Sequence, residues 1–419
     1  MHIPRDPPDT DSVLNDRKEL EDFRSREIKR YAREFNRRYL HWSEVRLRDT
    51  GRFRPDTVWY LMKLYRMGNS VELRFGRTDY TYVVSDRILT LLYEFDTRLS
   101  SASQDPRDRN GRTYCFSDSV MEESIASSQM EGAVTTTKKA KEMLRLNIRP
   151  RNRSEHMIVN NYRAMLFIKE HLSEPLTLEL IRDIHSIVTD GTLDRGCVGR
   201  FRDNDDVVVQ DAITGEVFHR PVPFRDIGIS LSQLCDFVNS DSTTHPIIKG
   251  IILHYAVAYI HPFEDGNGRV ARSLFYWYTM RSGYRSVEYL ALSRYIKSHK
   301  GRYGEAYLFG ETDDNDMTYF ILFNLQALIS SVSDFEDYLR KKTEEDSVQN
   351  IPGLNERQTE IIYGMGEGGR TTVRSVQNQF GVSLNTARAD IRTLLDLGLI
   401  RESGKDVNMK VYIRTDKRP

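Results

Sequence analysis

The sequence predicts a mainly α-helical protein with one island of β structure and a small separate domain at its C-terminal end. Apolar residues recur three and four positions apart through most of the chain after Ser154, which is the period of amphipathic helices. The period changes at Val207–Val209, where a β-branched run is followed by a turn near Gly215 and a second short run, as in a β-hairpin. After Leu354, two helices, a turn, a longer helix and an alternating hairpin follow in the order of a winged helix-turn-helix.

Residues 1–100 are predicted to form an N-terminal helical region with a short hairpin. The first 20 residues are rich in Asp and Pro, which favours an unstructured tail. Pro55 marks a helix start, because proline fits the first turn, where the backbone N–H groups have no partner inside the helix. Residues 70–84 then alternate like two paired strands.

Two further domains follow from the same reading. Residues 101–345 are predicted to be a helical domain that includes the hairpin, with one helix near 118–132 and another that begins at a threonine cluster. A charged segment that ends in Pro352-Gly353 is the expected linker. The third domain is expected at 354–415.

Composition restricts the possible functions and the location. The chain has 61 Lys and Arg against 61 Asp and Glu, so any nucleic-acid binding must be local. Cys115, Cys197 and Cys235 lack metal-ligand spacing and indicate reduced thiols in a cytoplasmic protein. The N-terminus lacks the apolar core of a signal peptide, and no apolar segment approaches the ~20 residues of a membrane span.

The stretch HPFEDGNGRVAR, residues 261–272, interrupts two apolar segments with a polar cluster. If one helix ends before it and another starts near Arg269, the backbone N–H groups of the new helix form an anion site. Gly266 and Gly268 allow a phosphate to approach the backbone closely. Arg269 and Arg272 lie three apart, on one helix face, as a clamp on further phosphate oxygens requires.

The same stretch carries an acid–base group and a metal ligand. His261 has an ordinary pKa near neutrality, so it can accept a proton from a hydroxyl group. Asp265 supplies the hard oxygen that Mg²⁺ prefers when it bridges phosphates. The alternative interpretation is an ordinary capped helix with surface salt bridges. The combination of these residues in one window favours attack by a hydroxyl on a nucleotide phosphate.

This stretch resembles the motif of the Fic family, HPFx(D/E)GN(G/K)RxxR, at every defined position. The matching residues are His261, Pro262, Phe263, Asp265, Gly266, Asn267, Gly268, Arg269 and Arg272. The resemblance implies a Fic-type helical bundle with a β-hairpin flap. It also implies an enzyme that transfers AMP from ATP to a Ser, Thr or Tyr hydroxyl of a target protein and releases pyrophosphate.

The resemblance assigns a role to each matching polar residue. His261 is implied as the general base, and Asp265 as the ligand of Mg²⁺ or Mn²⁺. The amides of Gly266, Asn267 and Gly268 are implied as the anion hole. Arg269 and Arg272 are implied to hold the β- and γ-phosphates.

Two other segments fit the same family. The strand island with Val207, Val208 and Val209 stands where the family keeps its flap, whose edge would pair with the backbone of the target protein. Tyr303 lies in a segment that resembles the adenine pocket. The family often has a Tyr-Tyr pair there, whereas this chain has Tyr303-Gly304.

The stretch ASSQMEG matches the inhibitory motif of the family, (S/T)xxxE(G/N), with Ser127, Glu131 and Gly132. The resemblance implies that Glu131 pairs with Arg272 and so withholds this arginine from the γ-phosphate. The alternative role for Glu131 is to orient a water that removes AMP from modified proteins. A Glu-Gly pair is otherwise common at the C-terminal end of a helix.

The sequence of the C-terminal domain does not decide what this domain binds. From Leu354 onward there are eleven Lys and Arg and eight Asp and Glu. Asn385, Arg388 and Arg392 share one face of the presumed recognition helix and could contact DNA. Protein contacts or a homodimer are the alternatives, and a nucleotide-sensing DNA-binding regulator is the second function considered for the whole chain. The sequence names neither the target protein nor the oligomeric state.

Overall fold

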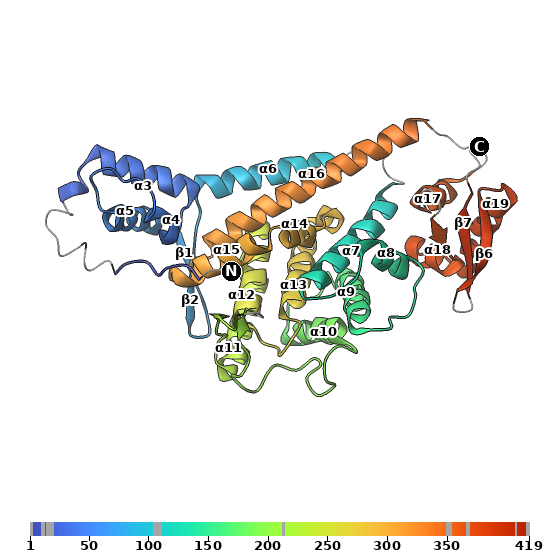
Figure 1. The fold of residues 1–419 in the computed structure, drawn as a ribbon, viewed down its shortest axis with the longest axis horizontal. Coiled ribbons are helices and arrows are strands. Elements are labelled where there is room, and N and C mark those ends of the chain that lie inside the picture. The colour runs from blue at the N-terminus through green and yellow to red at the C-terminus, as the bar shows by residue number, and fades with distance from the viewer. Residues whose placement is uncertain are drawn as a thin grey trace.

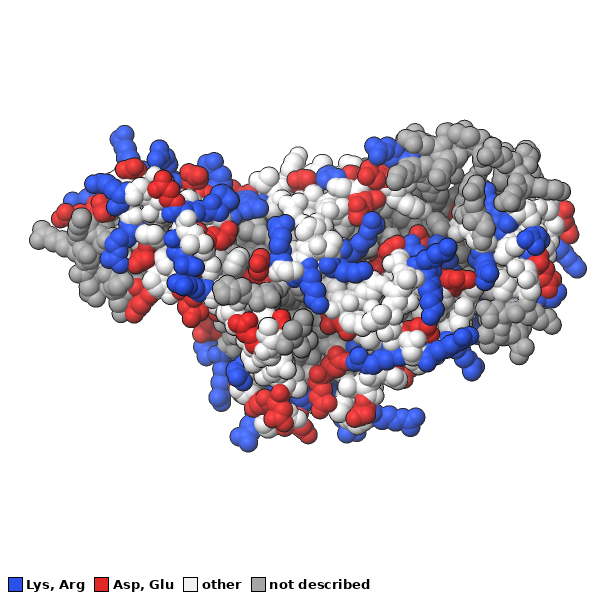
Figure 2. Space-filling model, viewed as in Figure 1, with Lys and Arg blue, Asp and Glu red and all other residues white. Residues whose placement is uncertain are grey.

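The protein is an elongated, mostly helical molecule with its N-terminal helices at one end and its C-terminal domain at the other (Figure 1). The computed structural model describes residues 3–9, 13, 21–103, 111–211, 214–348, 354–365, 369–406 and 409–415. Most of the predicted N-terminal tail and part of the predicted linker, residues 349–353, lie outside these ranges. Charges of both signs are interspersed on the face shown in Figure 2, in keeping with equal numbers of basic and acidic residues.

In the described part of the N-terminal region, three helices enclose a core of their own. These helices are α3 (Arg26–Arg38), α4 (Trp42–Val45) and α5 (Pro55–Met67), and the core they share includes Trp59. The predicted helix start at Pro55 is confirmed, since this proline occupies the first turn of α5. The predicted hairpin is also confirmed as β1 (Ser70–Phe75) and β2 (Thr78–Val83).

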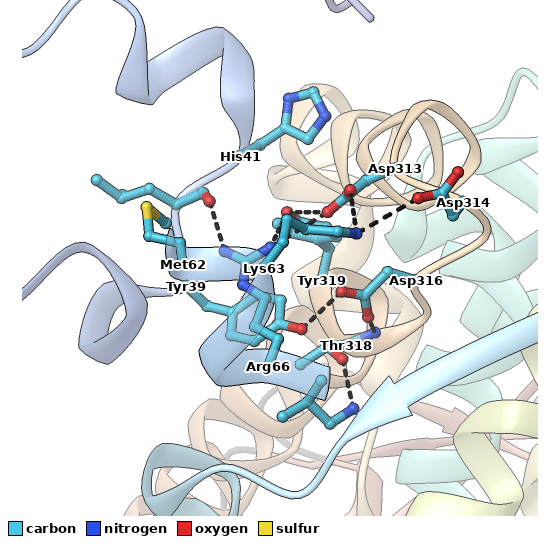
Figure 3. A network of polar contacts seen from close by, with 12 residues as sticks. Tyr39, His41, Met62, Lys63, Arg66, Asp313, Asp314, Asp316, Thr318 and Tyr319 are labelled. Atoms are coloured by element: carbon cyan, nitrogen blue, oxygen red, sulfur yellow. Dashed lines mark hydrogen bonds and ion pairs between the residues drawn. The ribbon is translucent and has the colours of Figure 1, made fainter. Parts of the chain in front are cut away.

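A buried polar network joins this region to the middle of the molecule (Figure 3). Arg66 of α5 is 4% exposed and donates to Asp313 at 3.2 Å, while Lys63 contacts the same carboxylate at 2.6 Å. The hydroxyl of Tyr39 donates to Asp316 at 2.6 Å. Because buried charges are costly when unpaired, these contacts fix the N-terminal helices against the turn before α16.

The middle of the molecule is one helical body around the largest hydrophobic core. Its helices are α6 (Asp86–Ser103), α7 (Gly111–Met130), α8 (Thr137–Arg145), α9 (Arg153–Glu170), α10 (Leu178–Thr189), α11 (Ile227–Ser240), α12 (Pro246–Ile260), α13 (Asn267–Arg281), α14 (Leu292–Ser298), α15 (Lys300–Thr312) and α16 (Thr318–Val348), with 3₁₀ turns at Phe224–Asp226 and Arg285–Tyr289. The long helices α6 and α16 pack side by side along one edge (Figure 1).

Helices α12 and α13 pack against each other at the centre of this body. Both are buried on nearly every side, in keeping with the mostly apolar sequence of α12, whereas α13 buries polar side chains in its first two turns as well as aromatic ones further on. The polar loop 261–266 therefore opens between two core helices, as the sequence predicted. Helix α13 begins at Asn267, two residues before the predicted start.

The predicted flap is a short antiparallel hairpin. Strand β3 (Val209–Gln210) pairs with β4 (Val217–His219), and Gly215 has the positive φ of 71° that the turn needs. Val207 and Val208 were expected in the strand but lie outside the paired residues. The β-branched run Val207–Val209 suggested a longer strand than the one that is paired with β4.

The C-terminal domain has the predicted order of elements. It contains α17 (Glu356–Met365), β5 (Arg370–Thr371), α18 (Val373–Phe380), α19 (Leu384–Asp396), β6 (Ile400–Asp406) and β7 (Met409–Arg414), with the sheet order β5-β7-β6. Helix α18 packs on α7 of the helical body, whereas α19 lies at the far end of the molecule (Figure 1). The linker is shorter than predicted, because α16 continues to Val348. Among the described helices, none combines the length and apolar character required to cross a membrane.

Candidate active site

The loop between α12 and α13 holds His261 in an unusual backbone conformation. His261 is the C-cap of α12 with φ 51° and ψ 60°, a left-handed conformation that costs free energy for a residue other than glycine. The buried side chain of Arg202 stabilises it, since Nε donates to the His261 carbonyl at 3.0 Å. The Arg202 backbone N–H donates to the carbonyl of Pro262 at 2.9 Å. Arg202 thus supports the loop, and no sequence pattern indicated this role.

The ring of His261 is set up as a base. Its Nδ1 lies 3.2 Å from the Ala258 carbonyl. A carbonyl oxygen only accepts, so Nδ1 carries the hydrogen and Nε2 keeps its lone pair. Burial lowers the pKa of His261 to about 4, with further lowering by His219 and Arg202 and partial compensation by the Ala258 carbonyl and Glu131. The ring is therefore neutral at physiological pH.

Asn267 holds the loop closed from the inside. Its side-chain oxygen accepts from the Phe263 N–H at 2.9 Å, and its side-chain nitrogen donates to the Phe263 carbonyl at 2.7 Å. This side chain is 3% exposed. It is therefore the backbone of Asn267, at the start of α13, that faces the pocket, and the side chain serves the loop.

A second histidine supports the loop from α10. His185 stacks on Phe263 with ring centroids 3.7 Å apart, and its Nε2 donates to the Asp265 carbonyl at 3.0 Å. Its Nδ1 accepts from the Gly199 N–H at 3.0 Å, which fixes the neutral tautomer. Burial lowers the pKa of His185 to about 4. No sequence pattern indicated a role for His185, because it lies 76 positions upstream of the loop.

Helix α13 offers an open N-terminus at this loop. Its N-cap is Gly266 with φ 89°, and no side chain of the described residues caps the first turn. The Gly266 N–H donates to the carboxylate of Asp265 at 2.6 Å. The amides that follow lie at the positive end of the helix dipole, which attracts anions.

The carboxylate of Glu131 lies at this helix N-terminus. A Cβ placed on Gly268 would overlap the Glu131 Oε1, so only glycine leaves room for the carboxylate there. Oε1 also accepts from Arg272 Nη2 at 2.8 Å. Glu131 and Gly132 close α7, as predicted, and Gly132 has φ 91°. An acidic side chain of the chain itself thus stands at the anion site.

Arg272 is hydrogen-bonded to the segment 127–131 at the end of α7. Its Nε donates to the Ser127 hydroxyl at 2.8 Å and Nη2 donates to the Ser127 carbonyl at 3.2 Å, in addition to the Glu131 contact. The side chain is 2% exposed. Burial alone would lower the pKa of Arg272, but Glu131 raises it above its ordinary value. The structure therefore brings together Glu131 and Arg272, as expected, and adds the contacts of Ser127 to the same arginine.

Arg269 lies apart from Arg272 and is fully buried under the loop. Its Nη1 donates to the Val188 carbonyl at 2.5 Å, and its Nη2 is 3.8 Å from the Asp265 carboxylate. Its Nε and Nη2 have no hydrogen-bond partner among the described residues. Burial lowers the pKa of Arg269. A phosphate contact by Arg269 stays a prediction, because in this structure it does not line the pocket beside His261.

Asp265, the predicted metal ligand, is partly exposed. One carboxylate oxygen lies 2.9 Å from Arg153, which comes from the start of α9. Among the described residues, no group of three or more His, Cys, Asp or Glu side chains could hold a metal ion. A single carboxylate suits Mg²⁺ only where substrate phosphates and waters complete the coordination.

A pocket of about 270 Å³ lies between the loop, the flap and α15. Its lining includes Met130, Glu131, Val209, Phe218, His219, Tyr259, His261, Gly268, Arg272, Tyr303, Tyr307 and Glu311. The predicted adenine-pocket residue, Tyr303, is therefore present on its wall, with its hydroxyl 2.9 Å from His254 Nε2. Of the predicted flap residues, Val209 alone is on this wall.

The flap is fastened to the pocket by a residue that the sequence did not reveal. His219 of β4 donates from Nε2 to the Tyr259 carbonyl at 2.7 Å, and its Nδ1 lies 2.8 Å from Glu311 of α15. Both ring nitrogens thus face acceptor oxygens. The contact thus joins the flap to α15 within the pocket lining.

The fold and the site define a class of protein. It is a mostly helical protein in which a neutral histidine at one helix end shares a pocket with the open N-terminus of the next helix. The match to known families is specific: residues 175–279 match the model of the Fic/DOC family. Over these residues the chain is therefore similar to the Fic/DOC family. The matched range includes the loop and excludes Glu131 and Tyr303.

Similar proteins agree with this assignment. The chain is 34% identical over 128 residues to "Protein adenylyltransferase Fic" of Drosophila willistoni, a match that covers 30% of this chain and 24% of the relative. The protein of the same name from Drosophila virilis is 35% identical over 128 residues, with the same coverage. The chain thus spans about a quarter of the length of these curated relatives.

The fold has a counterpart among solved structures. A Fic family protein from Desulfovibrio desulfuricans G20 superimposes with a TM-score of 0.52 at 19% sequence identity. The match covers 81% of this chain and 98% of that protein. The likeness extends beyond the residues that the family model matches and supports the fold of the larger part of the chain.

Proposed function

We propose that this chain is a protein adenylyltransferase, which transfers AMP from ATP to a hydroxyl of a target protein and releases pyrophosphate. One observation carries the proposal: the lone pair of His261 Nε2, the first amides of α13 and Arg272 belong to one pocket. A base, an anion site and a cation for charged oxygens are the parts that nucleotidyl transfer needs. The similar Drosophila proteins are named protein adenylyltransferases, which supports the same reaction.

The chemistry follows from the placement of His261. In the proposed reaction, Nε2 accepts the proton of a target Ser, Thr or Tyr hydroxyl, and the oxygen attacks the α-phosphorus of ATP. The bond from that phosphorus to the pyrophosphate oxygen breaks. The amides at the start of α13, with Arg272, stabilise the negative charge of the phosphates. His261 is suited to this role because its ring is neutral and held in one tautomer.

Mg²⁺, or Mn²⁺, is part of the proposal. When bound, the metal ion neutralises the charge of the phosphates as the leaving group departs. Asp265 is the residue that would hold it, because its carboxylate is partly exposed next to the N-terminus of α13. Arg153 would have to release this carboxylate.

The proposal includes inhibition within the chain. Glu131 occupies the helix N-terminus and pairs with Arg272, so an ATP γ-phosphate competes with a carboxylate that is already bound. Ser127 adds two contacts to the same arginine. A nucleotide that binds without contacts to Arg272 and the N-terminus of α13 is misplaced. Misalignment of reacting atoms costs orders of magnitude in rate.

The partners of the proposed reaction are ATP and a protein. Tyr303 and the aromatic wall around it would contact the base of ATP. The exposed edge of β3 at Val209 would pair with the backbone of the target. The thiols that the structure describes, Cys197 and Cys235, are free, which fits a reducing compartment such as the cytoplasm.

The test uses Glu131→Gly with ATP labelled either at the α- or at the γ-phosphate. AMP transfer places the α-label on protein and releases the γ-label as pyrophosphate. Transfer of the γ-label alone would indicate phosphorylation and overturn the proposal. Loss of label from previously modified protein with the wild type, but not with Glu131→Gly, would instead identify AMP removal, the alternative role of Glu131.

DNA binding by the C-terminal domain is a second candidate function, favoured by one observation. Asn385, Arg388 and Arg392 are exposed on α19, which faces away from the helical body (Figure 1). Binding through these residues should weaken steeply as salt increases. A gel-shift assay of the full chain with Arg388→Ala/Arg392→Ala as control tests it, and no shift at low salt would exclude it.

A further inference from the structure

Helices α7 and α13 are joined by polar contacts at three successive turns. The pairs are Glu123 with Tyr276, Ser127 with Arg272, and Glu131 with Gly268 and Arg272. Along α7 these residues are four apart, and their partners on α13 are four apart in the opposite direction. The two helices therefore run antiparallel here with a single register, and Glu131 is the last contact of the series.

The first contact of the series, Glu123, is a fully buried carboxylate. It is 2% exposed. One oxygen accepts from the Tyr276 hydroxyl at 2.9 Å and from the Ser293 N–H at 2.8 Å. The other accepts from the Ser293 hydroxyl. Glu123 thus contacts both α13 and α14, eight residues before Glu131 on the same face of α7.

A fully buried carboxylate is energetically unfavourable, so its presence calls for an explanation. Burial raises the pKa of Glu123 above its ordinary value, against the opposing effect of Ser293 and Arg272. An apolar side chain in this position would avoid the desolvation of a carboxylate. An apolar side chain could not fix the orientation of α7. The hydrogen bonds of Glu123 to Tyr276 and Ser293 can, because they are satisfied in only one rotation of this helix.

We infer that Glu123 is a positioning residue for inhibition: it fixes the rotation and register of α7 so that Glu131 reaches Arg272 and the N-terminus of α13. A slip of one residue would turn α7 by about 100° and shift it by about 1.5 Å. The carboxylate of Glu131 would then point away from the anion site. The inference rests on the proposed adenylyltransferase activity and its inhibition by Glu131.

Two roles of Glu123 can be distinguished by the sign of the effect. If Glu123 only stabilises the fold, its removal lowers stability and activity together. If it positions Glu131, its removal increases AMP transfer, because an inhibitory group is released. A gain of activity is a result that a purely structural role does not produce.

The test compares AMP transfer by the full chain with wild type, Glu123→Ala, Glu123→Gln and Ser293→Ala. We expect Glu123→Ala to raise transfer roughly tenfold, because it removes all three hydrogen bonds of a buried group. Ser293→Ala removes one of them and should raise transfer roughly threefold. Glu123→Gln keeps the acceptor and should remain inhibited like the wild type. Ser293→Ala keeps the test decisive if Glu123→Ala does not fold.

Two controls separate this inference from the proposed function. Asp316→Asn alters another buried carboxylate, which accepts from Tyr39 (Figure 3) and is not part of the pocket lining, and should not raise transfer. The double variant Glu123→Ala/Glu131→Gly should transfer no faster than Glu131→Gly alone. If Glu131→Gly is active but Glu123→Ala and Ser293→Ala stay at the wild-type rate, the inference is wrong. If Glu131→Gly itself transfers no AMP, the proposed function fails first.

Discussion

The loop 261–268 and the end of α7 meet at the same anion site, yet they are held in different ways. The loop is held by its immediate surroundings: Asn267 bonds twice to Phe263, and His185 supports the Asp265 carbonyl. The end of α7 is held by contacts with α13, chiefly through Arg272. The contacts that hold the loop therefore do not involve Glu131.

Under the proposed function, this difference would allow the chain to have a complete catalytic loop and still be inhibited by Glu131. Removal of Glu131 takes away one carboxylate and leaves the hydrogen bonds of the loop intact. Removal of a loop residue affects His261 directly. The following predictions use this separation, because variants of the two regions should have opposite effects on AMP transfer.

The largest effect is expected from the base. In a Glu131→Gly background, His261→Ala should lower AMP transfer by about 10² to 10⁴-fold, the usual contribution of general base catalysis. ATP binding, measured by calorimetry, should change little, because the anion site is formed by α13 and Arg272. Transfer that persists at the Glu131→Gly rate would mean that another group accepts the proton.

Asn267→Ala should open the loop. It leaves the buried N–H and carbonyl of Phe263 without partners, which costs about 2 kcal/mol of unfolding free energy. In the Glu131→Gly background, transfer should fall as well, because His261 and the α13 N-terminus are no longer fixed. Asn239 is a matched control, since it bonds in the same way to both backbone groups of Leu176 at 2.9 and 2.8 Å. Asn239→Ala should lower stability and spare transfer, and equal loss of transfer in both variants would contradict the account.

The pH dependence should report the burial of His261. Its pKa is lowered to about 4 in the folded protein, against 6.5 for the ordinary group. The unfolded chain therefore binds a proton more readily, so the stability associated with the neutral ring is present above pH 6.5 and is lost as pH falls towards 4. The difference in unfolding free energy between wild type and His261→Ala should shift against the wild type from pH 7 to pH 5. A ring that titrates near pH 6.5 by NMR would contradict this prediction.

The smallest effect is expected at Asp265. Arg153 is 59% exposed and pairs with this carboxylate at 2.9 Å, so it competes with a cation for the same oxygen. Arg153→Ala should lower the Mg²⁺ concentration needed for half-maximal ATP binding by about two- to fivefold, as expected for an exposed pair. Arg163, also 59% exposed and 3.8 Å from Asp190, provides the control variant Arg163→Ala. An unchanged Mg²⁺ requirement in Arg153→Ala would show that Asp265 does not bind the metal.

The sequence predicted the parts of the site that lie close together in the chain. The loop, the helices on both sides of it and the Ser127–Glu131 segment could be predicted because each carries its chemistry within a few residues. The pairing of Glu131 with Arg272 was also expected, and the structure shows it at 2.8 Å. The local sequence pattern was sufficient to predict these features because their residues lie within a few positions of one another.

The sequence did not reveal the residues that support the site from other elements. His185, Arg202, His219 and Glu123 act through contacts across long sequence separations, and their spacing gave no signal. Arg269 illustrates the converse. Its spacing from Arg272 suggested that both arginines hold the same phosphates. Residues three apart on a helix, however, differ by about 60° in direction. Arg269 is buried under the loop and bonds to the Val188 carbonyl, whereas Arg272 bonds to Glu131.

The central claim is that Glu131 holds the anion site in an inhibited state, and the initial rate of AMP transfer tests it most directly. Wild type and Glu131→Gly would be compared at saturating Mg²⁺ and ATP with α-labelled nucleotide. We predict that Glu131→Gly is faster on the order of 10²-fold, because the γ-phosphate can then occupy the site and align the α-phosphate. Equal rates, or a slower Glu131→Gly, would contradict the claim and show that the carboxylate serves another step.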